Sequence, residues 1–288
     1  MKKIEVFPAV PQGAWGWQAA ANFILGGAGT GFYLFSLIVM ALEDSSFVLS
    51  KQVPYGFLAP VLAAIGFLAL TTKPGRPLRG FYLFGNIRQA WVSRETLFWT
   101  LFIPVATLDW FIQNPVIRVI AIVLSLAFMI SQGAILYQIR AISGWNVFII
   151  PVFFLSSGFA SGAGMYLLTG NLSRSSVTLS TILIVLAILS INLVIWLLYL
   201  YLYRSKAYRE AMERLRRPLN LFITISLGHI LPAILLFLFI VWGNESERHF
   251  FAEIVVGVAV LLGIIIQKMA IVISASNMKT ILIGSSKN

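Results

Sequence analysis

Side chains suited to proton chemistry stand in segments of this chain that are otherwise apolar: Glu95, Asp109, His229 and Lys268. Ionisable groups inside a membrane-spanning segment are costly and are usually retained for function. A carboxylate can take a proton as a general base, and an imidazole or an amine can pass one on. Glu95 is therefore a candidate catalytic base, and Asp109, His229 and Lys268 are candidates for a proton path, each alongside a structural interpretation.

Polar side chains at the ends of neighbouring apolar segments are expected to lie near Glu95. Amides and phenols donate hydrogen bonds to a ligand oxygen, and a cation stabilises negative charge on it. With a base among them, such groups form a pocket for a neutral ligand with two oxygens, which describes a quinol. The converging residues include Gln18, Asn22, Lys73, Gln132 and Tyr137, of which all but Gln132 are predicted to bind the quinone.

Two of the ionisable residues have equally simple structural interpretations. Glu95 can cap the helix that begins beside it and pair with Arg79, Arg88 or Arg94, because a carboxylate in a first helical turn is favourable. Asp109 lies near the end of its apolar segment, where a solvated interfacial carboxylate is as compatible with the sequence as a functional one.

The few histidines and the lack of cysteine limit the cofactors. Without cysteine the chain holds no disulfide, thiolate metal site or iron–sulfur cluster. Of its two histidines only His229 is mid-segment, whereas His249 is in a loop, so we expect no bis-histidine haem and no metal. His229 is alternatively a hydrogen-bonded packing residue. Lys268 is near the end of its segment and can instead extend its ammonium group to the headgroups.

The composition is that of a membrane protein. Of 288 residues, 59% are hydrophobic and 11% are charged, against about 25% charged residues in soluble domains. Apolar runs of about 20 residues cross a bilayer as helices. The predicted fold class is an all-α polytopic membrane protein with eight transmembrane helices, at residues 18–42, 54–71, 95–113, 115–138, 144–169, 177–203, 219–242 and 253–274.

The chain contains an internal repeat. The run NFILGGAGTGFYL, from Asn22, resembles the run FFLSSGFASGAGMYL, from Phe153. Each is a small-xxx-small face that lets helix backbones approach closely in lipid. We predict two four-helix bundles related by this repeat, residues 1–140 with the quinone site and residues 141–288. The matched pairs, 131 residues apart, are Gly27 with Gly158, Thr30 with Ser161 and Gly31 with Gly162.

Positive charge is unequally divided between the two sides of the predicted membrane protein. The net charge is +11, and with the N-terminus in the cytoplasm 16 of the 21 lysines and arginines fall in cytoplasmic loops. This is the positive-inside signal, so both termini of a multi-pass cell-membrane protein are predicted to be cytoplasmic. This distribution indicates that the cations set the orientation of the protein in the membrane and contact anionic headgroups of the lipid bilayer. No nucleic acid is expected as a partner.

The stretch KPGRPLRG…GNIRQAWVSRE, residues 73–95, resembles the HLGRPxRA…N…SWLSRE segment of membrane anchor subunits of DMSO reductase-type complexes. These anchors belong to the NrfD and polysulfide-reductase membrane-subunit family. The runs WGWQAAANFILGGAGTG and ISGWNVFIIPVFFLSSGFASGAGMYLL are similar to two further segments of that family.

This resemblance implies eight spans in two bundles, no haem, and electron exchange between membrane quinol and an iron–sulfur subunit. By position, Glu95 matches the acid after S-R and Arg79 the second arginine of G-R-P-x-R, and both are associated with the quinol pocket in that family. Lys73 stands where the family usually has histidine. Lysine supplies a cation but is a poor proton shuttle at neutral pH, so this departure puts a role in proton transfer in doubt there.

The predicted function is the membrane anchor and quinone-binding subunit of a multi-subunit oxidoreductase of anaerobic respiration. It would use menaquinone or another quinone, with a ferredoxin-like iron–sulfur subunit and a molybdopterin catalytic subunit as partners. It would have no catalytic redox centre of its own. A secondary transporter and a passive membrane anchor are the alternatives, because duplicated bundles with broken helices also occur in transporters.

Overall fold

The computed structural model describes residues 3–7, 15–42, 55–72, 84–172, 177–203, 205–242, 246–276 and 281–284. Its regular secondary structure is helical apart from one pair of short strands. The α-helices are α1 (Trp17–Leu42), α3 (Tyr55–Thr71), α4 (Trp91–Ile112), α5 (Pro115–Tyr137), α6 (Ile149–Leu172), α7 (Leu179–Tyr201), α8 (Lys206–Glu213), α9 (Pro218–Leu221), α10 (Leu231–Trp242) and α11 (Ser246–Met269). Two π-helices, η2 (Phe222–Ile230) and η3 (Ala270–Ser274), continue α9 and α11.

Seven helical segments of the described part are long and apolar enough to cross a membrane. Large apolar side chains such as Leu183, Ile191 and Val194 of α7 are exposed, as a lipid-facing surface requires. The predicted class, an all-α multi-pass membrane protein, is confirmed at this level. The second predicted span corresponds to α3, which has 17 residues with Pro60 inside it, so the number eight stays a prediction.

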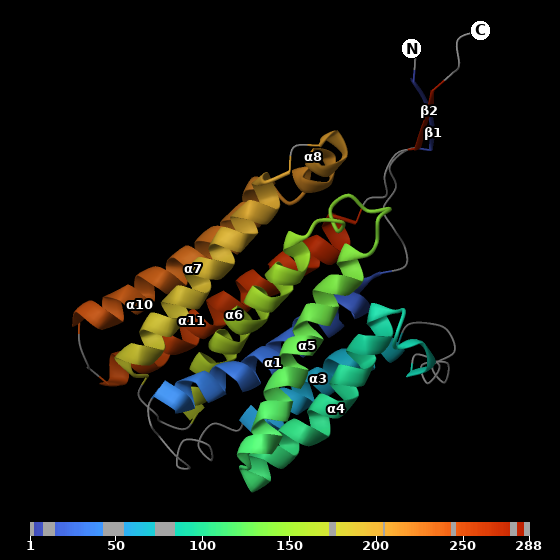
Figure 1. Cartoon of the computed structure of the whole chain (residues 1–288). Coiled ribbons are helices and arrows are strands. Elements are labelled where there is room, and N and C mark those ends of the chain that lie inside the picture. The colour runs from blue at the N-terminus through green and yellow to red at the C-terminus, as the bar shows by residue number, and fades with distance from the viewer. Residues whose placement is uncertain are drawn as a thin grey trace.

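Helix α1 is central to the packing. It contacts α3 and α6 most extensively, and it also contacts α5 and α11. In Figure 1, α3, α4 and α5 lie on one side of α1, whereas α6, α7, α10 and α11 lie on the other. Contacts between α4 and α5 and between α6 and α11 complete the two sides. The division into bundles at residue 140 stays a prediction.

The contact between α1 and α6 is made by glycines of the two predicted small-residue faces. A Cβ at Gly31 would overlap the backbone of Gly158, and a Cβ at Gly162 would overlap the backbone of Gly31. The backbones of α1 and α6 therefore approach as closely as two small-residue faces allow.

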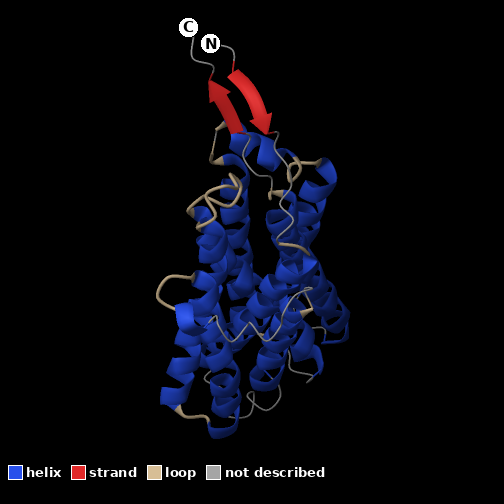
Figure 2. Ribbon diagram, turned by 90° about the vertical axis from the view of Figure 1, so that its right-hand side faces the viewer, coloured by secondary structure: helices blue, strands red, loops and turns tan. Residues whose placement is uncertain are grey.

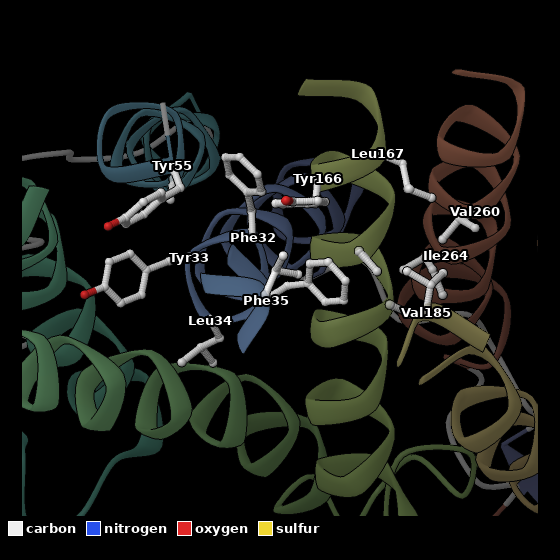
Figure 3. Close-up of a cluster of buried hydrophobic side chains, with 14 of the residues drawn as sticks. Phe32, Tyr33, Leu34, Phe35, Tyr55, Tyr166, Leu167, Val185, Val260 and Ile264 are labelled. Carbon is white, nitrogen blue, oxygen red and sulfur yellow. The ribbon is translucent and has the colours of Figure 1, made fainter. Parts of the chain in front are cut away.

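Buried aromatic rings extend this contact into the core. The Phe35 ring lies 5.3 Å from the Tyr166 ring of α6, and the Tyr33 ring lies 5.6 Å from the Phe102 ring of α4. Figure 3 shows Phe35 beside Tyr166, and Tyr33 and Tyr55 with hydroxyl groups that point the same way. Edge-on ring contacts of this kind stabilise a core beyond the area they bury.

The two ends of the chain pair as strands, which the all-α prediction did not include. Strand β1 (Lys3–Phe7) runs antiparallel to β2 (Ile281–Gly284). Figure 2 shows the pair at one end of the helices, with both termini beside it. The ends of the chain therefore lie on the same side of the helices, as the charge distribution predicts, while the identity of that side stays a prediction.

Candidate functional site

Glu95 lies one turn inside α4 and not at its start. The prediction placed the beginning of the helix at residue 95, but α4 begins at Trp91, so Glu95 is its fifth residue. The N-cap is Ala90, with no side-chain cap, and Glu95 is only 5% exposed. The interpretation of Glu95 as a first-turn cap is therefore wrong, because its carboxylate is buried inside the protein.

The arginine next to this carboxylate is engaged elsewhere. Arg94 Nε donates to the carbonyl oxygen of Ile87 at 2.9 Å, and its Nη2 donates to that of Arg88 at 2.8 Å. Its guanidinium group also lies 4.4 Å from the centre of the Trp91 ring. Arg94 thus holds the loop before α4, and no cation forms an ion pair with Glu95 in the described part of the chain. Arg79 and Lys73 lie outside that part.

Two amides hold the Glu95 carboxylate instead. Asn22 Nδ2 of α1 donates to Glu95 Oε1 at 2.9 Å, and the side-chain amide of Gln132 of α5 also hydrogen-bonds with Glu95. Gln132 Nε2 in addition lies 3.3 Å from the carbonyl oxygen of Asn22. All three side chains are buried. Gln132, expected only to lie nearby, is thus a direct partner of the candidate base.

Two acceptor atoms of this cluster have no hydrogen-bond donor among the described residues. No described group donates a hydrogen bond to Asn22 Oδ1 or to Gln132 Oε1, although both atoms are buried. A buried acceptor without a donor costs about 1–3 kcal/mol, so such atoms usually mark a site for water or a ligand. The cluster is therefore able to accept hydrogen bonds from a hydroxyl group beside the Glu95 carboxylate.

Lys268 approaches the same cluster from α11. The residue is fully buried, and its Nζ donates to the carbonyl oxygen of Phe23 at 2.9 Å. The amino group fills the space where a Cβ of Gly27 would lie, and Gln132 Oε1 is 3.5 Å from that position. Lys268 therefore does not extend to the headgroups, which was one of its two interpretations.

Two further predicted quinone-binding residues that the structure describes, Gln18 and Tyr137, lie outside the buried cluster. Gln18, one helical turn before Asn22, is half-buried, and its Oε1 lies beside Gly16. Tyr137 is 41% exposed, and its backbone carbonyl accepts a hydrogen bond from Asn146 Nδ2 at 2.8 Å. The described structure thus brings Asn22 and Gln132 to Glu95 and Lys268 to the backbone next to Asn22, and leaves Tyr137 on the surface.

Asp109 belongs to a separate cluster near the other end of α4. It is fully buried, and the Tyr33 hydroxyl group donates to its Oδ2 at 2.8 Å. Arg118 Nε lies 3.4 Å from its carboxylate oxygens, with the arginine side chain 30% exposed. The solvated alternative for Asp109 is therefore wrong. Its partners are residues of α1 and α5, and none of them is shared with Glu95.

His229 lies in η2 and is hydrogen-bonded at both ring nitrogens. Nδ1 lies 2.7 Å from the carbonyl oxygen of Thr224, five residues earlier, and Nε2 lies 2.9 Å from Asn192 Oδ1 of α7. A cavity of about 330 Å³ beside it is lined almost entirely by apolar residues of α7, η2 and α10. These contacts are those of a packing residue that joins α7 to η2.

The described residues contain no group of three histidines or carboxylates that could hold a metal ion. Compared as a whole, the sequence matches no protein-family model and no curated protein. The support for a function comes from the Glu95 cluster itself.

Proposed function

We propose that the chain is the membrane anchor and quinol-binding subunit of a multi-subunit molybdopterin and iron–sulfur oxidoreductase. It would have eight spans in two bundles, as in the NrfD and polysulfide-reductase family that its sequence resembles. The observation that carries the proposal is the buried Glu95 carboxylate, held by Asn22 and Gln132 without an ion-pair partner in the described structure.

The chemistry of this cluster suits a quinol such as menaquinol. A quinol carries two hydroxyl groups, and the available acceptors Asn22 Oδ1 and Gln132 Oε1 are the atoms to which such groups donate. Oxidation of a quinol requires a base for its protons, and Glu95 is the base that these acceptors flank. The two amides fix the carboxylate, so that it is positioned before the ligand arrives.

The electrons would leave for a ferredoxin-like iron–sulfur subunit, since a chain without cysteine has no thiolate ligands for a cluster of its own. A molybdopterin subunit would lie beyond that partner. The protein would lie in the cell membrane with both termini in the cytoplasm, as its charge distribution predicts.

The experiment compares Glu95→Gln with the unchanged protein, both purified with their native partners. Gln keeps the shape and a hydrogen-bonding oxygen but cannot take a proton. We expect normal assembly, bound quinone in both samples, and quinol oxidation lowered about a hundredfold or more, the usual scale of general-base loss. Full turnover in an assembled Glu95→Gln complex would contradict the role of the base.

The same samples separate the alternatives. A passive anchor would contain no bound quinone and would be indifferent to Glu95→Gln. A secondary transporter would move a solute across vesicles when this chain is present alone, whereas the proposed subunit would not.

A further inference from the structure

A buried amine lies next to the amides that hold the Glu95 carboxylate, and it comes from α11, on the opposite side of α1 from α4 (Figure 1). Lys268 Nζ donates to the carbonyl oxygen of Phe23, the residue that follows Asn22. Gln132 faces both groups, because its amide hydrogen-bonds with Glu95 and its Oε1 points toward the space above Gly27 that the amine fills. One glutamine thus spans the gap between an acid and an amine.

The described helices that pack against α11 carry only one Asp, Glu, Lys, Arg or His residue. The helices against which α11 packs are α1, α6, α10 and η2. Their only Asp, Glu, Lys, Arg or His residue is His229, which is bonded to Thr224 and Asn192. A buried ion is costly unless it is paired or well hydrogen-bonded. Moving one proton from a carboxylic acid to an amine converts two neutral groups into an ion pair, so the protonation of each depends on the other.

We propose that Lys268 is the second proton acceptor of the Glu95 site, so that carboxylate and amine together take the two protons of one quinol. In the balanced step, quinol, Glu95 carboxylate, neutral Lys268 and two oxidised one-electron acceptors of the iron–sulfur partner react. The products are quinone, Glu95 carboxylic acid, Lys268 ammonium and two reduced acceptors. Both quinol O–H bonds break, and each proton has a named destination.

That the two protons come from a quinol rests on the proposed function. The coupling between the protonation of Glu95 and that of Lys268 does not depend on it. The decisive substitutions are Lys268→Met, which removes the amine but keeps an apolar stem, and Lys268→Arg, which keeps a cation that cannot release its proton. Gly27→Ala moves the amino group by occupying its space and leaves the lysine in the chain. Lys206→Met is the control, because Lys206 is exposed and pairs only loosely with Glu210 at 3.9 Å.

The first measurement needs no quinol. Infrared titration of the purified protein gives the midpoint at which the Glu95 carboxylate gains its proton, with the bands assigned by their absence in Glu95→Gln. We expect Lys268→Met to shift this midpoint by about one pH unit or more, the scale of coupled groups, and Lys206→Met to leave it in place. Gly27→Ala should shift it in the same direction as Lys268→Met. An unchanged midpoint in both Lys268→Met and Gly27→Ala would overturn the coupling.

The second measurement follows quinol oxidation in the assembled complex. We expect Lys268→Met and Lys268→Arg to lower it about tenfold or more at unchanged complex yield and quinone content. In the Glu95→Gln background, Lys268→Met should cost less than about a factor of two, because residues that act as a unit are not additive. Full activity in Lys268→Arg would show a purely electrostatic role and overturn proton transfer. An infrared shift without any quinol oxidation by the unchanged protein would confirm the coupling and refute the proposed function.

Discussion

Gly31 of α1 and Gly162 of α6 occupy matched positions of the predicted repeat, and they meet each other in the structure. A Cβ on Gly162 would overlap the backbone of Gly31. In a two-fold arrangement, a residue on the axis touches its own counterpart, as in the self-complementary contact of a symmetric dimer. A Cβ on Gly31 would instead meet Gly158, so the close contact is not fully reciprocal, and the relation of the two bundles by the repeat stays a prediction.

Gly31→Ala is expected to force α1 and α6 apart. The added carbon would meet the backbone of Gly158, which has no flexible end to swing aside, so we expect a loss of about 1–3 kcal/mol in the free energy of unfolding. Gly85→Ala is the matched control, because nothing lies within 4 Å of its added carbon. Thermal unfolding in detergent measures both, and equal midpoints would contradict the close approach.

Asp109→Asn is expected to destabilise the protein by about 1–2 kcal/mol, because it removes the charge that faces Arg118 but keeps an oxygen for the Tyr33 hydroxyl group. The expected loss of stability is smaller than for a fully buried ion pair, because the Arg118 side chain is partly exposed to solvent. Glu210→Gln, which breaks an exposed pair, should cost less than about 0.5 kcal/mol. Combining Asp109→Asn with Arg118→Gln should add little to either single loss, and full additivity in chemical unfolding would refute the pair.

His229→Leu is expected to cost about 1–3 kcal/mol, because it leaves Asn192 Oδ1 buried without a donor. Asn192→Leu in the same chain should recover part of that loss, since both polar partners are then gone. A double variant as unstable as the sum of the single ones would argue against this account. Visible spectra of the purified chain should show no Soret absorption, with or without His229.

Reporter domains fused to the two ends of the chain are expected to give the same signal, because β1 and β2 pair. The charge distribution predicts that this signal is cytoplasmic. Reporters on opposite sides would contradict the pairing of the ends. Two extracytoplasmic reporters would keep the pairing and reverse the predicted orientation.

Depth in the membrane could be predicted from the sequence, and rotation about a helix axis could not. Asn22 and Glu95 were expected to meet because each stands at the same end of a neighbouring apolar segment, and they form a hydrogen bond. Tyr137 has the same depth but is 41% exposed, because its helix turns it outward. Apolar residues surround these helices on all sides, so hydrophobic periodicity carries little information on which side faces the protein.

Contacts between helices that are far apart along the chain could not be predicted from the sequence either. Lys268 reaches the backbone of Phe23, 245 residues away, and no local pattern states which helix α11 will touch. The glycine runs gave a partial indication, since small-residue faces mark close helix contacts. They did not reveal that the amino group of a lysine would fill the space above one of these glycines, Gly27.

The antiparallel pairing of β1 with β2 makes the chain almost a closed ring. A short linker between the two ends would complete this ring, and the chain could then be reopened elsewhere as a circular permutant. New ends in the connection between α5 and α6, residues 138–148, would leave at the same end of the helices as the present ends, because Figure 1 shows this connection at the end where β1 and β2 lie. New ends between α4 and α5, at residues 113–114, would leave at the opposite end (Figure 1), so the first segment of that permutant would have to start from the other side of the membrane.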